Sequence, residues 1–198
     1  MKKSMLLIIS YFLFISSTIY GQGIDSLIKK AESGDTAAQC NLAKKYLQGQ
    51  GVPSDTVKAF YWYKKSAEQG NANAQDSLAG LYLGGKGTLK DLKKAFYWYK
   101  KSAEQGNAHA QVSLAILYSS GTGTLKDQIQ GFYWLKKSAE QGNVNAQFLL
   151  AFGYYYGIGT SVDKKQAAYW MRKAYDNGDK DAKDTWDRLE LWKYDGKN

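Results

Sequence analysis

Apolar and small side chains recur at helical spacing after Asp91. The positions i, i+3, i+4, i+7 and i+8 form one continuous face of a helix. In this segment they are Ala95, Trp98, Tyr99, Ser102 and Ala103. Asp91 is a suitable N-cap, because its carboxylate can accept hydrogen bonds from the free amides of a first turn. The pattern predicts a helix whose Ala–Trp face packs against the rest of the protein.

A second helix is predicted to follow the first almost without a loop. Gly106 suits the left-handed position that ends a helix, and Asn107 is a favourable N-cap. Helical spacing then continues through Ala110, Leu114, Leu117 and Tyr118 until "SSGTGT" breaks it. The two helices should form an antiparallel helical hairpin.

Nearly the same seventeen residues occur three times at intervals of 36. They read "AFYWYKKSAEQGNANAQ" from Ala59, "AFYWYKKSAEQGNAHAQ" from Ala95 and "GFYWLKKSAEQGNVNAQ" from Gly131. A motif with a fixed period indicates a building unit that packs on copies of itself. We therefore predict an all-α solenoid of stacked hairpins, one domain over residues 22–198. Its units span about 22–51, 52–87, 88–123, 124–159 and 160–198.

The terminal units depart from the pattern. The first unit begins at Ile24 and has Ser26 where the others have tryptophan. In the last unit Trp186 replaces leucine and Glu190 replaces tyrosine. Polar, atypical ends prevent a repeat stack from exposing an apolar face. We expect "DRLELWKYDGKN" to form a longer, more polar closing helix.

The first 21 residues have the layout of a secretory signal peptide. Lys2 and Lys3 precede an apolar run from Met5 to about Ile15, and small and polar residues follow it. Cleavage is expected near Gly21, which predicts an exported protein, periplasmic or secreted, with no stable membrane span after cleavage. The alternative is an uncleaved anchor, since the apolar segment is borderline in length for a membrane span.

The net charge indicates which kind of partner to expect, and the cysteine count excludes disulfides within the chain. The formal charge is +9, which can indicate nucleic acid binding. An exported chain rarely meets nucleic acid, so an acidic protein, peptide or envelope polymer is the expected partner. Cys40 is the only cysteine, so no disulfide can form within the chain. The sequence leaves the oligomeric state of the protein open.

No constellation of residues predicts catalysis, a metal or a cofactor. "GLYLGGKG" ends in Lys86–Gly87 rather than Lys–Ser/Thr and follows a predicted helix, so it does not match a phosphate-binding loop. One histidine, His109, and one cysteine cannot form a usual zinc site. Ser66, Ser102 and Ser138 recur on the packed face, where small size explains them. The protein is predicted not to be an enzyme.

The side of each first helix away from the Ala–Trp face carries a repeated tyrosine and two basic residues. We call this set the Tyr–Lys surface. It comprises Tyr61, Lys64, Lys65 and Glu68; Tyr97, Lys100, Lys101 and Glu104; Tyr133, Lys136, Lys137 and Glu140; and Tyr169, Arg172, Lys173 and Asp176. A solvated face explains the lysines but not a repeated exposed tyrosine. The predicted partner-binding residues are Tyr61, Lys64, Tyr97, Lys100, Lys101, Tyr133, Lys136, Lys137 and Tyr169.

The pattern "A-x-x-W-Y-x-K-x-A-x-x-G-x-x-x-A-Q-x-x-L", followed by "Y-x-x-G-x-G" and Asp, resembles the Sel-1-like repeat, a relative of the tetratricopeptide repeat. The resemblance extends from about Ile24 to Trp192. It implies a right-handed α-solenoid whose first helices line a concave side, and a scaffold that binds proteins or peptides there.

Two other functions stay open. Some secreted, cysteine-rich relatives are linked to β-lactam binding or hydrolysis, which makes a hydrolase of β-lactams or cell-wall fragments one alternative. The single Cys40 argues against it, because those relatives pin their helix pairs with cysteines. The other alternative is a sugar-binding module that stacks sugars on the tyrosines.

Residues from Met1 to about Gly21 are expected to be absent from the mature protein, because the charged start, the apolar run and the small residue at Gly21 match a cleaved signal. N-terminal sequencing of the native protein checks this. A sequence that begins at Met1 would contradict it.

Overall fold

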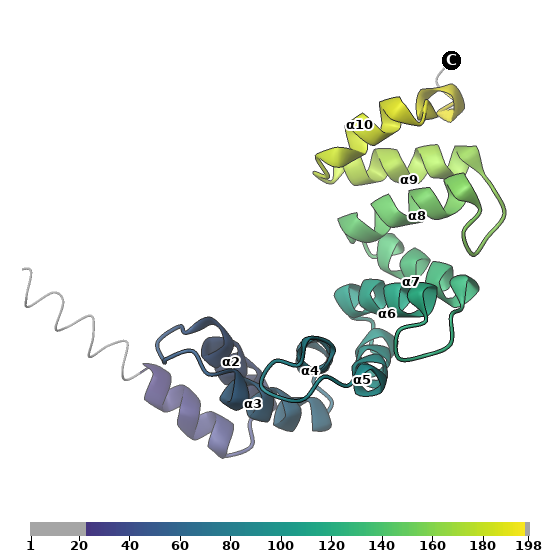
Figure 1. The fold of residues 1–198 in the computed structure, drawn as a ribbon. Coiled ribbons are helices and arrows are strands. Elements are labelled where there is room, and N and C mark those ends of the chain that lie inside the picture. The colour runs from purple at the N-terminus through teal and green to yellow at the C-terminus, as the bar shows by residue number, and fades with distance from the viewer. Residues whose placement is uncertain (1–22, 197–198) are drawn as a thin grey trace, which may run out of the picture. The chain divides into compact units, whose positions relative to one another are not determined.

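The computed structural model describes residues 23–196, and all regular secondary structure in that range is helical (Figure 1). The predicted all-α class is confirmed. The expected signal segment lies outside the described residues. The elements are a helix over residues 23–32, α2 (Thr36–Gln48), α3 (Thr56–Glu68), α4 (Ala72–Gly84), α5 (Leu92–Glu104), α6 (Ala108–Ser120), α7 (Gln128–Glu140), α8 (Val144–Tyr156), α9 (Lys164–Asp176), α10 (Asp181–Arg188) and the 3-10 helix η1 (Leu191–Tyr194).

The sequence repeat is also a structural repeat. Each helix from α2 to α9 has 13 residues, and within α2–α4 and within α5–α9 each helix packs on the next one in the chain. The contacts divide the chain into two compact units that meet in sequence between Leu89 and Lys90. One unit contains α2 to α4, and the other contains α5 to α10 and η1. The single domain expected over residues 22–198 stays a prediction.

The predicted caps start the helices. The Asp91 carboxylate accepts a hydrogen bond from the Lys94 amide at 3.0 Å, which also holds the pKa of Asp91 below its ordinary value. Asn107 accepts from the Ala110 amide at the same distance. An aspartate caps α3, α5, α7 and α9, and an asparagine caps α4, α6 and α8. The repeated Asp and Asn therefore fix where each hairpin begins.

The second helices from α2 to α8 each bury one leucine completely among small side chains. Leu42, Leu78, Leu114 and Leu150 are fully buried at equivalent positions of α2, α4, α6 and α8. Buried alanines surround them, including Ala59 on α3 and Ala95 on α5. Small side chains let the helix axes approach, and each buried leucine contributes roughly 1.5–3 kcal/mol.

Buried glutamines connect neighbouring helices. The Gln111 amide nitrogen donates to the Ala103 carbonyl at 3.1 Å, and its amide oxygen accepts from Gln141 at 2.8 Å. One side chain of α6 thus joins the end of α5 to the end of α7. Gln39 of α2 and Gln147 of α8 make equivalent bonds to both neighbours. The repeated "EQGN" and "AQ" therefore encode contacts between helices.

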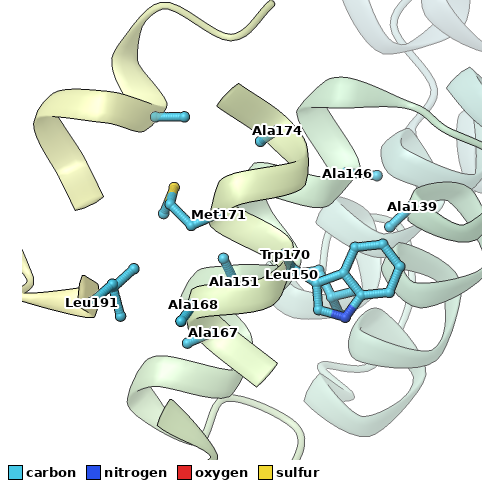
Figure 2. Packing of buried hydrophobic residues seen from close by; sticks show 11 residues of the cluster. Ala139, Ala146, Leu150, Ala151, Ala167, Ala168, Trp170, Met171, Ala174 and Leu191 are labelled. Carbon is cyan, nitrogen blue, oxygen red and sulfur yellow. The ribbon is translucent and has the colours of Figure 1, made fainter. Parts of the chain in front are cut away.

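The C-terminal end differs from the expected single closing helix, and that prediction is wrong beyond Arg188. Glu190 adopts a left-handed backbone with φ of 50° and turns the chain into η1. The turn allows Leu191 to join the buried cluster around Ala168 and Met171 of α9 (Figure 2). It also brings Asp195 within 2.6 Å of Arg172.

Glycines permit the tight loops between hairpins. Gly123 has φ of 71°, and a Cβ atom there would overlap the Leu92 carbonyl oxygen at the start of α5. Gly106, inside a hairpin, has φ of 92° but no atom within 4 Å of such a Cβ. Gly123 is therefore required both by its left-handed backbone and by the lack of room for a side chain. Gly106 is required by its left-handed backbone alone.

Gly123→Ala should therefore destabilise the protein more than Gly106→Ala. The left-handed conformation alone costs an alanine about 1–2 kcal/mol, and at Gly123 the backbone must also move. Urea unfolding of both variants measures the difference. Equal losses would show that the loop at Gly123 adapts freely to a methyl group.

Candidate functional site

The tyrosines of the Tyr–Lys surface are exposed, as predicted. Tyr61, Tyr97, Tyr133 and Tyr169 have relative exposures of 48%, 51%, 45% and 47%. They occupy the same position of α3, α5, α7 and α9, on the side away from the buried alanines. Such uniform exposure of a large aromatic ring on successive helices makes this surface the leading candidate site.

Each tyrosine packs on the tryptophan that follows it. The Tyr97 and Trp98 ring centroids are 5.0 Å apart with planes inclined at 79°, an edge-to-face contact. The other three pairs are Tyr61–Trp62, Tyr133–Trp134 and Tyr169–Trp170, with centroids 5.0–5.2 Å apart. Such pairs contribute about 0.5–1.5 kcal/mol beyond area burial. The tyrosine is therefore held in place before any partner binds.

The prediction that the Trp98 ring is buried on the packed Ala–Trp face needs correction. Ala95, Tyr99, Ser102 and Ala103 are buried, but Trp98 is half-buried at the edge of that face. Trp62 and Trp134 are likewise half-buried, and only Trp170 is buried. The edge position of Trp98 on α5 leaves one side of its ring to be covered by Tyr97.

The two basic residues of a set have different environments. Lys65, Lys101, Lys137 and Lys173 place their ammonium groups 4.9–5.8 Å from the centroid of the tyrosine ring four residues earlier. Lys64 and Lys100 instead lie 3.8 and 3.9 Å from Glu68 and Glu104. Those exposed ion pairs contribute little to stability. The set is thus a tyrosine between a tryptophan and a lysine, with a second lysine beside it.

Tyr97, Tyr133 and Tyr169 belong to the unit that begins at Lys90, while Tyr61 belongs to the other unit. In the later unit, α6 packs on both α5 and α7, and α8 packs on both α7 and α9. The second helices therefore space the three first helices that carry these tyrosines.

Candidate nucleophiles serve the fold instead. The Ser66 and Ser138 hydroxyls donate to the Thr36 and Ala108 carbonyls, each at 2.7 Å. Cys40 is half-buried, and burial raises the pKa of its thiol, so little thiolate is present near neutral pH. Across residues 23–196, no group of three histidine, cysteine or acidic side chains could hold a metal ion. Lys86 lies after the end of α4, not before the start of a helix that could bind phosphate.

An apolar groove lies on the same unit as Tyr97 and was not predicted from the sequence. It has a volume of about 370 Å³ between α6, α7 and α8. Its lining includes Ile116, Phe132, Leu135, Phe152 and Gly153 and contains no charged residue. In the sequence, this groove is indicated only by residues that differ from their counterparts in the other repeats.

The equivalent position between α2, α3 and α4 is filled. There Tyr63 is buried and hydrogen-bonded to Ser77; burial raises the pKa of its hydroxyl and this bond opposes the rise. Leu81 is 4% exposed. The counterparts of Tyr63, Ser77 and Leu81, two repeats later, are Leu135, Leu149 and Gly153. A polar pair and a filling leucine are thus replaced by two leucines and a glycine.

In the described part of the chain, no helix combines the length and the hydropathy that a membrane span requires.

Stacked two-helix repeats with these caps, buried glutamines and glycine loops define a helical-repeat scaffold. Comparison with known proteins is more specific. The Sel1 repeat family model matches residues 36–71, 72–107, 108–143 and 144–179, and the chain belongs to this family. The recognised resemblance is thereby confirmed. The family's repeats begin at the second helix of each hairpin, half a unit away from the boundaries predicted above.

Solved structures agree with this assignment. The chain is similar to c5321, a protective antigen of uropathogenic Escherichia coli strains with an SLR fold, at 35% identity and a TM-score of 0.80 over 82% of this chain and 35% of that one. A Sel1 repeat protein from Oxalobacter formigenes matches at 31% identity and a TM-score of 0.78 over 85% and 49%. This chain thus spans between a third and a half of the length of those two proteins.

Helicobacter pylori cysteine rich protein B has the same fold, at 23% identity and a TM-score of 0.54 over 69% of this chain and 98% of that one. No curated protein matches the sequence. The family is generally one of non-enzymatic repeat scaffolds that mediate interactions between proteins.

Substitutions on α5 should lower the free energy of unfolding in the order of the contacts that each side chain makes. Trp98→Ala should cost about 2–3 kcal/mol, less than the removal of a fully buried ring. Tyr97→Ala should cost about 1 kcal/mol through the lost ring pair, and Lys101→Ala at most about 0.5 kcal/mol. Chemical denaturation gives the three values. A loss at Tyr97 as large as that at Trp98 would mean that the tyrosine is a core residue.

Proposed function

We propose that this protein is an exported, non-enzymatic scaffold that binds an acidic protein or peptide through its Tyr–Lys surface. The observation that carries the proposal is the repeated triplet of tyrosine, tryptophan and lysine on the exposed side of the first helices. Family membership supports an interaction function, and the partner, its charge and the export are the proposed additions.

The triplet is preorganised for binding. Tyr97 contacts Trp98 on one side, and Lys101 lies 5.8 Å from its ring centroid. A partner therefore meets an aromatic ring whose rotamer freedom is already restricted, which lowers the entropy lost on binding. Tyrosines in such positions supply large contact areas at interfaces.

The charge of the surface favours an acidic partner. On each of α3, α5 and α7 the Tyr–Lys surface carries two lysines and one glutamate, so it has net positive charge. The glutamate forms only long, exposed ion pairs at Lys64 and Lys100, which a partner's carboxylate can replace at little cost. Complementary charge increases the association rate and the specificity more than the affinity.

The two other functions have weaker support. The Lys65, Lys101, Lys137 and Lys173 ammonium groups lie near the tyrosine rings, where a stacked sugar would compete with them. A hydrolase would need a nucleophile beside a base, whereas Ser66 and Ser138 donate to backbone carbonyls. A nitrocefin assay tests the β-lactam alternative directly.

The double variant Tyr97→Ala/Tyr133→Ala should bind biotinylated poly-L-glutamate about tenfold more weakly than the unmodified protein, because it loses two central aromatic contacts. Binding should also weaken from low to physiological salt, where exposed charges are screened beyond about 8 Å. Capture of partners from an envelope extract should fall in parallel.

Tyr175→Ala is the matched control, because Tyr175 is 49% exposed but lies outside the Tyr–Lys surface. Circular dichroism should show unchanged helicity in both variants. Equal binding by the double variant and the control would mean that the Tyr–Lys surface is only a solvated face. Nitrocefin turnover by the pure protein would contradict the non-enzymatic assignment.

A further inference from the structure

One row of half-buried and exposed positions on the second helices becomes apolar toward the C-terminus. Three of these positions, spaced i, i+4 and i+8, hold Phe148, Phe152 and Tyr156 on α8. Their counterparts are Val112, Ile116 and Ser120 on α6, Asp76, Gly80 and Gly84 on α4, and Cys40, Lys44 and Gln48 on α2. Phe148 and Phe152 are half-buried and pack partly against the hydrophobic core, whereas the earlier repeats fold without aromatic residues at these positions.

The three rings of α8 form a continuous ridge. The centroids of Phe148 and Phe152 are 5.1 Å apart, and those of Phe152 and Tyr156 are 6.0 Å apart with planes 15° from parallel. Tyr156 is 55% exposed, and Ile116 on the neighbouring α6 is 52% exposed. Exposed apolar side chains that cluster in this way mark interaction sites more often than scattered ones do.

A groove lies on each side of Phe152. On one side is the apolar groove between α6, α7 and α8, which Ile116 and Leu135 also line. On the other side is a groove of about 430 Å³ between α8 and α10, lined by Phe148, Phe152, Asp181, Asp184, Thr185 and Arg188. Phe152 is thus the wall shared by the two grooves.

The second groove has an acidic rim. Asp181 and Asp184 lie in the first turn of α10, and both are exposed. Arg188 supplies one positive charge, so the rim has a net charge of −1 within a chain of net charge +9. Complementary charge would attract a basic partner to this rim.

We propose that the two grooves beside Phe152 bind an amphipathic, basic helical segment of a partner protein. Its apolar side chains occupy the groove lined by Ile116 and Leu135 and cover Phe152. A lysine or arginine of the segment faces Asp181 and Asp184. The site uses other residues and the opposite charge preference from the Tyr–Lys surface, so it is a second docking site on the same unit.

The probe is a fluorescein-labelled 14-residue peptide of leucine and lysine, with all leucines on one helical face. Anisotropy with the purified protein should show saturable binding, and the same peptide with glutamate in place of lysine should bind at least about fivefold more weakly. Ile116→Gln combined with Phe152→Gln should weaken the Leu/Lys peptide about tenfold. Asp181→Asn with Asp184→Asn should weaken it about threefold and reduce its salt dependence.

Ile129→Gln is the matched control for the apolar variants, because Ile129 is 71% exposed on α7 but does not line the groove. Asp187→Asn is the control for the acidic rim. Ile116→Gln alone replaces an exposed side chain, so it retains the test if the Phe152 variant unfolds. Controls that bind like the unmodified protein would support the site.

Three results would overturn this proposal. One is no saturable binding of the Leu/Lys peptide. Another is equal weakening by Ile116→Gln and Ile129→Gln, which would mean nonspecific adhesion. The third is a dimer, seen by light scattering, that Ile116→Gln dissociates, which would make a second copy of this chain the occupant. The Tyr97→Ala/Tyr133→Ala variant should bind the peptide normally, so failure here and failure of the Tyr–Lys surface are distinguishable.

Discussion

The hydrogen bonds of one buried glutamine in each of α2, α4, α6 and α8 hold the repeat together. Gln147 is 2% exposed, donates to the Ala139 carbonyl at 3.2 Å and accepts from Asn177 at 2.9 Å. An amide buried without these partners would cost about 1–3 kcal/mol, so the ends of three successive helices must stay in place around it. This constraint fixes the hairpin, its caps and the spacing of 36 residues. Leucine and alanine packing adds stability to a geometry that the amide makes specific.

Because specificity lies inside the stack, the outer positions are free to change. The outer residues of the first and second helices vary to different extents between copies of the repeat. The outer side of α3, α5 and α7 repeats tyrosine and lysine almost unchanged, whereas the outer side of α2, α4, α6 and α8 differs in every copy. A repeated surface suits a partner that contacts several units alike. A surface such as that around Phe152, present on one helix only, suits a partner that binds at one place along the chain.

The sequence predicts what depends on the repeat and fails where a residue departs from it. Helices, caps and the glycine loops recur in each copy, so alignment alone indicates them. The burial predicted for the Trp98 ring is too high, because helical spacing does not distinguish a position inside the packed face from one at its edge, where Tyr97 covers the ring. The prediction of one long closing helix was wrong, because the turn at Glu190 depends on the tertiary packing of Leu191 and not on the local sequence. The groove at Gly153 was missed, because a missing side chain leaves no motif.

The two candidate surfaces meet on a single helix without interfering. On α7, Phe132 lines the groove while the adjacent Tyr133 lies on the exposed side, about 100° further around the helix axis. Two hydrogen bonds hold α7, which carries both residues, against α6. The Ser138 hydroxyl donates to the Ala108 carbonyl, and Gln141 donates to Gln111. A rigid helix with separate contacts on two sides keeps substitutions on one side from disturbing the other. That rigidity allows one short scaffold to present a basic aromatic surface and an apolar groove at the same time.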